Sequence, residues 1–305
     1  MKQLITLLKA LRKLKLRTLY HLILRASVNE SPQIKVLKTE NGYFSGLEND
    51  ALFQLAIKQG SNEPHFESFA KLILLPKDVV VDLGGNIGTH SIIMSKIVYQ
   101  GKVYTFEPQS LTYSILQNNL LLNKCDNVSA YRFAILNENH KTISMRPFSY
   151  VGPSINNGAL RVDPNGFMGD FALTRTLDSF NFDHINFIKI DIQGSEVKAL
   201  QGAKSTISKC RPYMLIEIEQ IFLLHMGTTT KELIELIFSF DYALYKIVNN
   251  YSSDHICIPI EKADHFERVI VKKLDFKVSS KIYGRQVEAV FERNNDNNYK
   301  ELIIK

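Results

Sequence analysis

Acidic residues stand at the ends of short apolar runs, and their chemistry and position suit them to bind or orient a ligand. Four such runs each end on an acid, and these acids are Asp82, Glu107, Asp191 and Glu217. Apolar runs of this length are typical of buried parallel strands. Because ligands bind outside the carboxyl ends of such strands, we expect the four carboxyl groups to converge on one crevice. An acidic crevice favours a cationic or hydroxyl-rich ligand.

The first acid opens a glycine-rich turn, in which residues 82–88 read Asp-Leu-Gly-Gly-Asn-Ile-Gly. Glycine lacks a Cβ atom, so Gly84 and Gly88 permit positive φ angles and let a ligand lie against bare backbone amides. The spacing lacks the third glycine of the dinucleotide fingerprint, and no Gly-Lys-Ser/Thr follows as in a P-loop. We interpret the stretch as a ligand-binding turn; the alternative is a strand-to-helix turn without a ligand.

The elements that must position these residues alternate along the chain. Apolar spacing predicts helices over residues 64–75, 89–98, 111–123, 196–202 and 231–240. Apolar runs and alternation predict strands over residues 79–82, 103–107, 128–133, 172–177, 185–191, 214–219, 243–248 and 255–260. This order indicates an α/β fold with a mostly parallel sheet.

Composition sets bounds on the class of protein. The 305 residues are 45% hydrophobic, which is ordinary for one large or two small globular domains. The net charge of +6 is spread along the chain, so it gives little indication of nucleic-acid binding. Cys125, Cys210 and Cys257 lack disulfide or zinc spacing, which fits a reducing cytoplasm. No apolar run reaches membrane-spanning length.

Three stretches stand apart from this pattern. Residues 1–27 are basic and leucine-rich, with the leucines on one helical face. We favour a helix packed on the domain or a partner; an interfacial helix on anionic lipid and a targeting peptide are the alternatives. Residues 145–171 are rich in loop-forming residues and are expected to cover the site. Residues 294–298 are expected to be a loose or disordered tail.

Taken in order, several motifs resemble those of the FkbM family of S-adenosylmethionine-dependent methyltransferases over about residues 62–260. The matching motifs are Glu63-Pro64, the turn at 82–88, Phe106-Glu107-Pro108, the asparagines Asn118 and Asn123, Thr176-Leu177-Asp178, residues 188–196 and residues 212–217. Gln193 stands where the family usually has glutamate, and Gly85 stands where it has alanine.

The resemblance implies a class I methyltransferase (Rossmann-like) fold, a seven-stranded, mostly parallel sheet flanked by helices with one antiparallel strand near the end. We expect a basic helical N-terminal extension over residues 1–61, the methyltransferase domain over 62–262, and a polar, partly disordered C-terminal extension over 263–305. The implied activity is methyl transfer from S-adenosylmethionine to a hydroxyl oxygen of a sugar, glycolipid or polyketide-like acceptor. The expected location is the cytoplasm, with peripheral membrane contact through residues 1–27 as an open alternative.

The same resemblance suggests roles for individual residues. We assign Glu107 to the ribose hydroxyls of the donor and Asp82 to organising the turn. The donor's amino-acid part falls to the turn residues Gly84, Gly85, Asn86 and Gly88. Near the methyl group we place Asp191, as base or as orienter of the acceptor hydroxyl. Lys189 either stabilises the developing alkoxide or forms a structural ion pair with an acid such as Asp191.

Several alternatives stay open at this point. His90 could act as the base, although we rank it behind Asp191. Asp191 and Glu217 could hold a divalent metal, for which the sequence gives no separate support. Rival functions are an RNA methyltransferase, a nicotinamide oxidoreductase, which the glycine spacing disfavours, and a non-catalytic module that binds S-adenosylmethionine.

Overall fold

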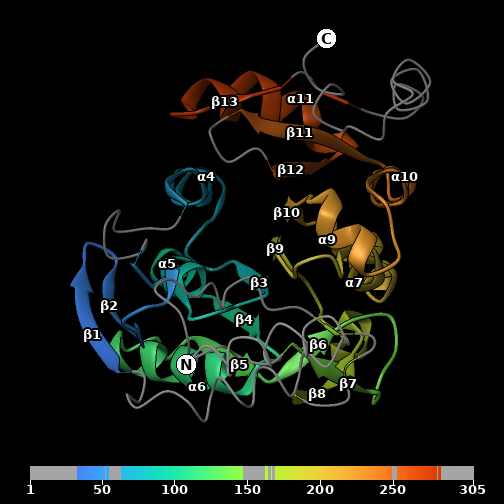
Figure 1. Cartoon of the computed structure of the whole chain (residues 1–305). Helices are drawn as coiled ribbons and strands as arrows, with labels where there is room; N and C mark the ends of the chain where they lie inside the picture. The colour runs from blue at the N-terminus through green and yellow to red at the C-terminus, as the bar shows by residue number, and fades with distance from the viewer. Residues whose placement is uncertain are drawn as a thin grey trace, which may run out of the picture.

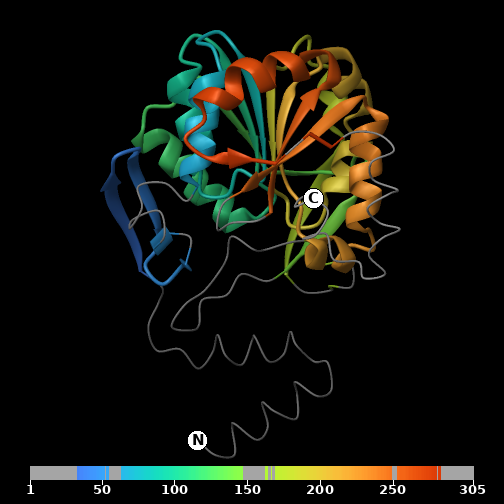
Figure 2. The same cartoon turned by 90° about the horizontal axis from the view of Figure 1, so that it is seen from above.

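The computed structural model describes residues 33–51, 53–54, 63–146, 162–163, 166, 169–248, 253–279 and 281–282. A single large sheet lies at the centre, with helices on both of its faces (Figures 1 and 2). The predicted helix over residues 1–27, the middle of the predicted loop at 145–171 and the predicted tail at 294–298 lie outside the described residues.

The large sheet has eight strands in the order β13-β11-β12-β10-β9-β3-β4-β5. The parallel part is formed by β10 (Tyr213–Glu217), β9 (Phe187–Ile190), β3 (Val79–Leu83), β4 (Lys102–Phe106) and β5 (Val128–Tyr131). The antiparallel pairs involve β12 (Asp254–Pro259), β11 (Tyr242–Val248) and the edge strand β13 (Lys277–Val278). The predicted class I fold is confirmed, and the short β13 is added to the seven expected strands.

Side chains alternate between the two faces of each strand, and helices cover both faces, so both faces of this sheet are buried. One face packs against α4 (Pro64–Ile73), α5 (Thr89–Ile97), α11 (Ala263–His265) and the helical turns η3 (Ile260–Lys262), η4 (Phe266–Ile270) and η5 (Val271–Lys273). The other face packs against η2 (Leu177–Phe180), α7 (Glu196–Gln201), α8 (Lys204–Cys210), α9 (Gln220–His225) and α10 (Thr230–Ser239). The carboxyl ends of the parallel strands are left at one rim.

A second, three-stranded sheet lies beside the rim. Its order is β6-β8-β7, with β6 (Phe133–Ile135), β8 (Asp170–Arg175) and β7 (Thr142–Met145). The predicted strand at 128–133 is therefore divided at Arg132, between β5 in the large sheet and β6 in the small one. Because the chain changes sheets there, β6 lies where it can form a wall beside the rim.

The structure differs from the expected extensions at both ends. Within the expected helical extension, residues 34–47 form a hairpin, β1 (Ile34–Thr39) and β2 (Gly42–Leu47), as the possible turn at Asn41-Gly42 indicates. Ser45 binds α6 (Ser110–Leu122) through Asn119, whose Oδ1 accepts from the Ser45 backbone N at 2.6 Å. At the other end, the stretch expected to be polar contributes Phe266, which is fully buried. In the described part of the chain, no helix is both long and apolar enough to cross a membrane.

Candidate active site

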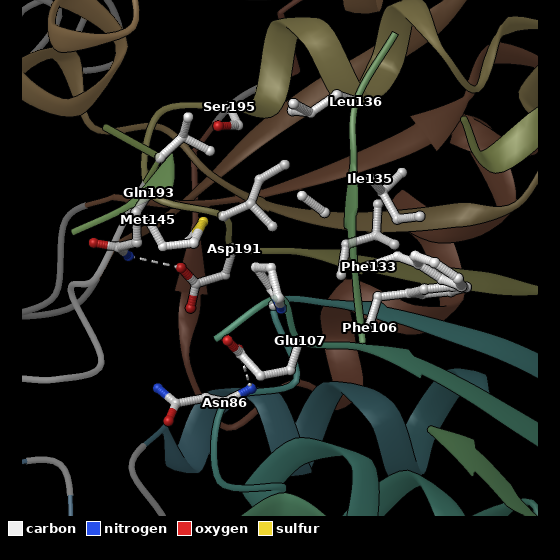
Figure 3. A pocket seen from close by; sticks show the side chains of 16 residues that line it. Asn86, Phe106, Glu107, Phe133, Ile135, Leu136, Met145, Asp191, Gln193 and Ser195 are labelled. Atoms are coloured by element: carbon white, nitrogen blue, oxygen red, sulfur yellow. Dashed lines mark hydrogen bonds between the residues drawn. The ribbon is translucent and has the colours of Figure 1, made fainter. Parts of the chain in front are cut away.

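A pocket opens at the rim where β3, β4 and β9 end, and it encloses about 580 Å³ of space including the part open to solvent (Figure 3). Its polar lining comes from Gly84, Asn86, Glu107, Asp191, Gln193 and Ser195. Its apolar lining includes Leu83, Phe106, Phe133, Ile135 and Met145. A pocket with an apolar wall and a few convergent polar groups is the usual form of a small-molecule site.

The predicted convergence of the four acids takes place in two layers. Glu107 and Asp191 line the pocket, whereas Asp82 and Glu217 are buried behind it. Register explains part of this order, because Asp82 on β3 lies beside Lys189 on β9, and their side chains share the face covered by α4 and α5. Of the four predicted acids, Glu107 and Asp191 therefore form part of the pocket wall, and Asp82 and Glu217 lie behind that wall.

The glycines of the turn are required by close packing. Gly84 has a φ of +88°, and a Cβ atom there would lie 1.9 Å from the backbone oxygen of Asp191. A Cβ on Gly85 would lie 2.1 Å from Thr105 Oγ1. Gly88 has a φ of +97°. The chain can turn between β3 and α5 this tightly only without side chains at these positions.

The expectation of bare amides in this turn is wrong. The backbone nitrogens of Gly84 and Gly85 both donate to Phe106 O at 3.0 Å. The nitrogen of Gly88 donates to Gly85 O at 2.8 Å, and that of Asn86 donates to a side chain. Because β4, Glu107 and the turn itself already take these donors, the turn can offer a ligand its shape rather than these N–H groups.

Glu107 is held by two backbone hydrogen bonds. Its Oε2 accepts from the nitrogen of Asn86 at 3.0 Å, and its Oε1 accepts from the nitrogen of Gln109 at 2.9 Å (Figure 3 draws the first). Burial raises the pKa of Glu107 to about 7, more than these two bonds lower it. Each oxygen retains a lone pair, so the side chain can accept hydroxyl hydrogens from a ligand in the pocket.

Asp82 has a supporting position. The side chain is fully buried, and its Oδ2 accepts a hydrogen bond from Ser91 Oγ at 2.5 Å. Since Ser91 is in the first turns of α5, this bond ties the end of β3 to the helix that follows the glycine turn. The role of Asp82 in organising the turn for a ligand stays a prediction.

Lys189 contacts an acid instead of the pocket. Its Nζ lies 3.1 Å from Asp191 Oδ2, and the side chain is only 3% exposed. Burial alone would lower the pKa of Lys189, but the carboxylates of Asp191 and Glu63 raise it above its ordinary value. Of the two open alternatives for Lys189, the geometry favours the ion pair.

Gln193 occupies the space between two of the acids. Its Nε2 donates to Asp191 Oδ1 and to Glu217 Oε2, each at 2.8 Å. An amide nitrogen is a donor and cannot ligate a cation. Turning the amide would present Oε1, which can ligate a cation, so a metal shared by these two carboxyl groups stays a prediction.

These features match a known family. The pattern of the methyltransferase FkbM domain covers residues 82–244, which is more than half of the chain. The chain belongs to this family. The resemblance predicted from the motifs is thereby confirmed.

Relatives of this chain include two curated proteins. It is 27% identical over 162 residues to the hexuronic acid methyltransferase AglP of Haloferax volcanii, covering 52% of this chain and 61% of the relative. It is 25% identical over 142 residues to methyltransferase 1 of Beauveria bassiana, covering 40% and 57%. The matched part of the chain thus spans about three fifths of the length of these relatives.

Solved structures with a similar course of the chain are more distant. The FkbM methyltransferase of Methylobacillus flagellatus has a TM-score of 0.42 and 19% identity, covering 60% of this chain and 44% of that one. An O-methyltransferase structure from Klebsiella pneumoniae, described as putative in its own name, has a TM-score of 0.41 and 12% identity, covering 64% and 79%.

Sequence reasoning missed a buried cluster at the same rim of the sheet. Ligand-type atoms of Glu63, His65 and Asp254 lie within 4.8 Å of one another, and His65 Nε2 is 2.6 Å from Asp254 Oδ2. Asp254 is the first residue of β12, whereas the four predicted acids stand at the ends of their strands. Because β12 is antiparallel, its first residue lies at the same rim, opposite Glu217. The resemblance implies one antiparallel strand near the end of the sheet, and the start of such a strand lies at this rim. That expectation could have pointed to Asp254.

His90 joins this cluster. Its Nε2 lies 3.3 Å from Glu63 Oε2, and its ring packs edge-on against Phe66 with 4.4 Å between the ring centroids. Among the described residues that line the pocket, His90 is absent. The geometry therefore supports ranking His90 behind Asp191 as a base.

Proposed function

We propose that the protein transfers the methyl group of S-adenosylmethionine to a hydroxyl oxygen of a small, sugar-like acceptor. The observation that supports this most is the meeting of the glycine turn, Glu107 and Asp191 at one pocket. Membership of the FkbM family supports the donor, and a relative that acts on a hexuronic acid supports the acceptor class.

The pocket residues fit the donor's chemistry. S-adenosylmethionine supplies an electrophilic methyl group on a positively charged sulfur, together with an adenine ring and two ribose hydroxyls. Phe106, Phe133 and Ile135 offer an apolar wall for the ring, and Glu107 offers carboxylate oxygens for the hydroxyls. The carboxyl groups of Glu107 and Asp191 suit a cationic ligand.

Each residue then has a distinct task in holding the donor. Glu107 accepts hydrogen bonds from the ribose hydroxyls while its backbone bonds fix its position. The turn of Gly84, Gly85, Asn86 and Gly88 leaves room for the amino-acid part. Asp82 holds this turn on α5 through Ser91.

Asp191 is the group proposed to receive the proton of the acceptor hydroxyl. Each of its oxygens takes one hydrogen bond from the protein, from Lys189 and from Gln193, and each retains a further lone pair. Lys189 gives Asp191 a buried cationic partner, with its Nζ 3.1 Å from Asp191 Oδ2. A transfer of this kind requires an in-line oxygen, and aligning that oxygen is the main contribution of the site.

Donor binding and acceptor screening test this function. We expect calorimetry to show binding of S-adenosylmethionine to the full chain. With a radiolabelled methyl group, we expect incorporation into hydroxyl-bearing sugars, with hexuronic acids the first class to screen. Asp191→Asn should bind the donor and lose incorporation. Donor binding without incorporation into any hydroxylated acceptor would favour a non-catalytic module, and incorporation into RNA alone would replace the proposed acceptor class.

A further inference from the structure

A glutamine amide at the pocket joins the carboxyl group of Asp191, which lines the pocket, to that of Glu217 behind it. Nε2 of Gln193 donates one hydrogen bond to Asp191 Oδ1 and another to Glu217 Oε2, each 2.8 Å long (Figure 3 draws the first). Lys189 Nζ contacts Oδ2, the other oxygen of Asp191. The four side chains form one continuous series of polar contacts.

The orientation of the Gln193 amide follows from these neighbours. Amide nitrogen and oxygen are assigned from their partners, and carboxylate oxygens accept hydrogen bonds. The reverse orientation would set the amide oxygen against both carboxyl groups. Instead, Oε1 is buried without a hydrogen-bond partner within the described structure. The two hydrogen bonds from Nε2 to Asp191 and Glu217 thus form at the cost of an unsatisfied Oε1.

The loop that carries this side chain is held in place. Gln193 has a φ of +54° and Gly194 a φ of +101°, and a Cβ on Gly194 would lie 2.2 Å from Phe222 O. Glu196 Oε1 accepts from the backbone nitrogens of Ile192 at 3.2 Å and Gly194 at 3.1 Å. A left-handed residue other than glycine persists where its surroundings fix it. The side chain of Gln193 therefore starts from a fixed backbone.

The surroundings of the carboxyl pair are mostly acidic. Four charged or titratable groups act directly on Asp191 or Glu217: Glu107 after β4, Lys189 on β9, Glu196 on α7 and Asp254 on β12. Three more act on Lys189 or Asp254: Asp82 on β3, and Glu63 and His65 at the start of α4. Burial, followed by the charges of Asp191 and Asp254, raises the pKa of Glu217 well above its ordinary value. Lys189 is the cation in contact with Asp191.

We propose that Gln193 is a positioning residue that holds Asp191 and Glu217 side by side through the two hydrogen bonds of its amide nitrogen. Because the amide is uncharged, it gives both carboxyl groups a donor without adding a negative charge to the buried rim. The catalytic consequence rests on the proposed function. As the acceptor oxygen forms its bond to the methyl carbon and the carbon–sulfur bond breaks, the hydroxyl proton passes to Asp191, which Gln193 holds in place.

Gln193→Glu tests this proposal, because it adds a charge at nearly constant size. The variant should melt below the wild type, and the difference in Tm should widen by about 5 °C or more between pH 5.5 and pH 8.5. The added carboxyl group has a folded pKa above its unfolded value. Its destabilising effect is therefore absent at low pH and grows as pH rises through the folded pKa.

Gln201→Glu is the matched control. Gln201 is exposed at the end of α7, and its Oε1 accepts from the exposed Asn137. The difference in Tm for this variant should stay constant with pH to within about 1 °C. The double variant Gln193→Glu with Glu217→Gln restores one amide and two carboxyl groups. It should recover the pH dependence of the wild type, including where Gln193→Glu alone does not fold.

Two further results separate this proposal from the proposed function. In active protein, the acid limb of the kcat profile of Gln193→Glu should move up by about one pH unit, with donor affinity at pH 8 changed less than about threefold. A Tm difference independent of pH, or no recovery in the double variant, would overturn the positioning role whether or not transfer occurs. A widening difference in a protein that binds no donor would support the positioning role and contradict the proposed function.

Discussion

At the scale of single residues, position relative to the pocket decides what each carboxyl group can do, since Glu107 and Glu217 are both buried. Glu107 and Glu217 both end apolar strands in the sequence, yet one lines the pocket and the other lies behind it. Sequence position predicted the convergence of these acids. It could not predict which oxygens would already be occupied, because backbone nitrogens of Asn86 and Gln109 reach Glu107 only in the folded chain.

The raised pKa of Glu107 leads to a prediction about donor affinity. Ionised Glu107 accepts the ribose hydroxyls best, and its pKa is about 7. Affinity should therefore fall as pH falls below 7, and be about tenfold weaker at pH 6 than at pH 8. Calorimetry at several pH values measures this change. Glu107→Gln should bind more weakly and lose this part of the pH dependence; identical profiles for the two proteins would refute the assignment.

At the scale of elements, the turn between β3 and α5 shows what a motif can and cannot reveal. Its glycines were predicted from spacing, and the structure explains Gly84 by the approach of Asp191 O. The role of the amides was predicted incorrectly. The sequence did not show that Phe106 O would take the N–H groups of Gly84 and Gly85.

Gly84→Ala should destabilise the fold severely. The added Cβ would lie 1.9 Å from backbone, at a φ of +88°. Gly227→Ala is the control, because Gly227 has a φ of +76° but nothing within 4 Å of its added Cβ. We expect about 1–2 kcal/mol from the φ strain in the control and at least about 2 kcal/mol more in Gly84→Ala. Urea unfolding measures both; equal losses would count against the close-packing explanation.

At the scale of the whole molecule, the central sheet was predictable because most of its strands are apolar runs long enough to be buried on both faces. The ends of the chain were less predictable. Residues 263–279 look polar as a whole, but Ala263, Phe266 and Ile270 turn toward the sheet. Short helical turns give too few residues for a clear period, so this contribution to the core was missed.

Phe266→Ala tests that contribution. The side chain is fully buried against Phe69 and Tyr245, with ring centroids 6.4 and 4.8 Å away. Its removal should lower the free energy of unfolding by about 3–5 kcal/mol. Phe171→Ala, at a half-exposed position on β8, should lower it by less than about 1 kcal/mol. A small loss for Phe266→Ala would place the C-terminal segment outside the core.

The proposed function requires a donor site at the rim, which Glu107 and the glycine turn form and which Asp191 adjoins. Calorimetric titration of S-adenosylmethionine into wild type, Glu107→Ala and Asp191→Ala tests it most directly. We predict binding to the wild type, an affinity loss of about tenfold or more in Glu107→Ala, and a change below about threefold in Asp191→Ala despite lost turnover. Unchanged affinity in Glu107→Ala, or no binding to the wild type, would contradict the account.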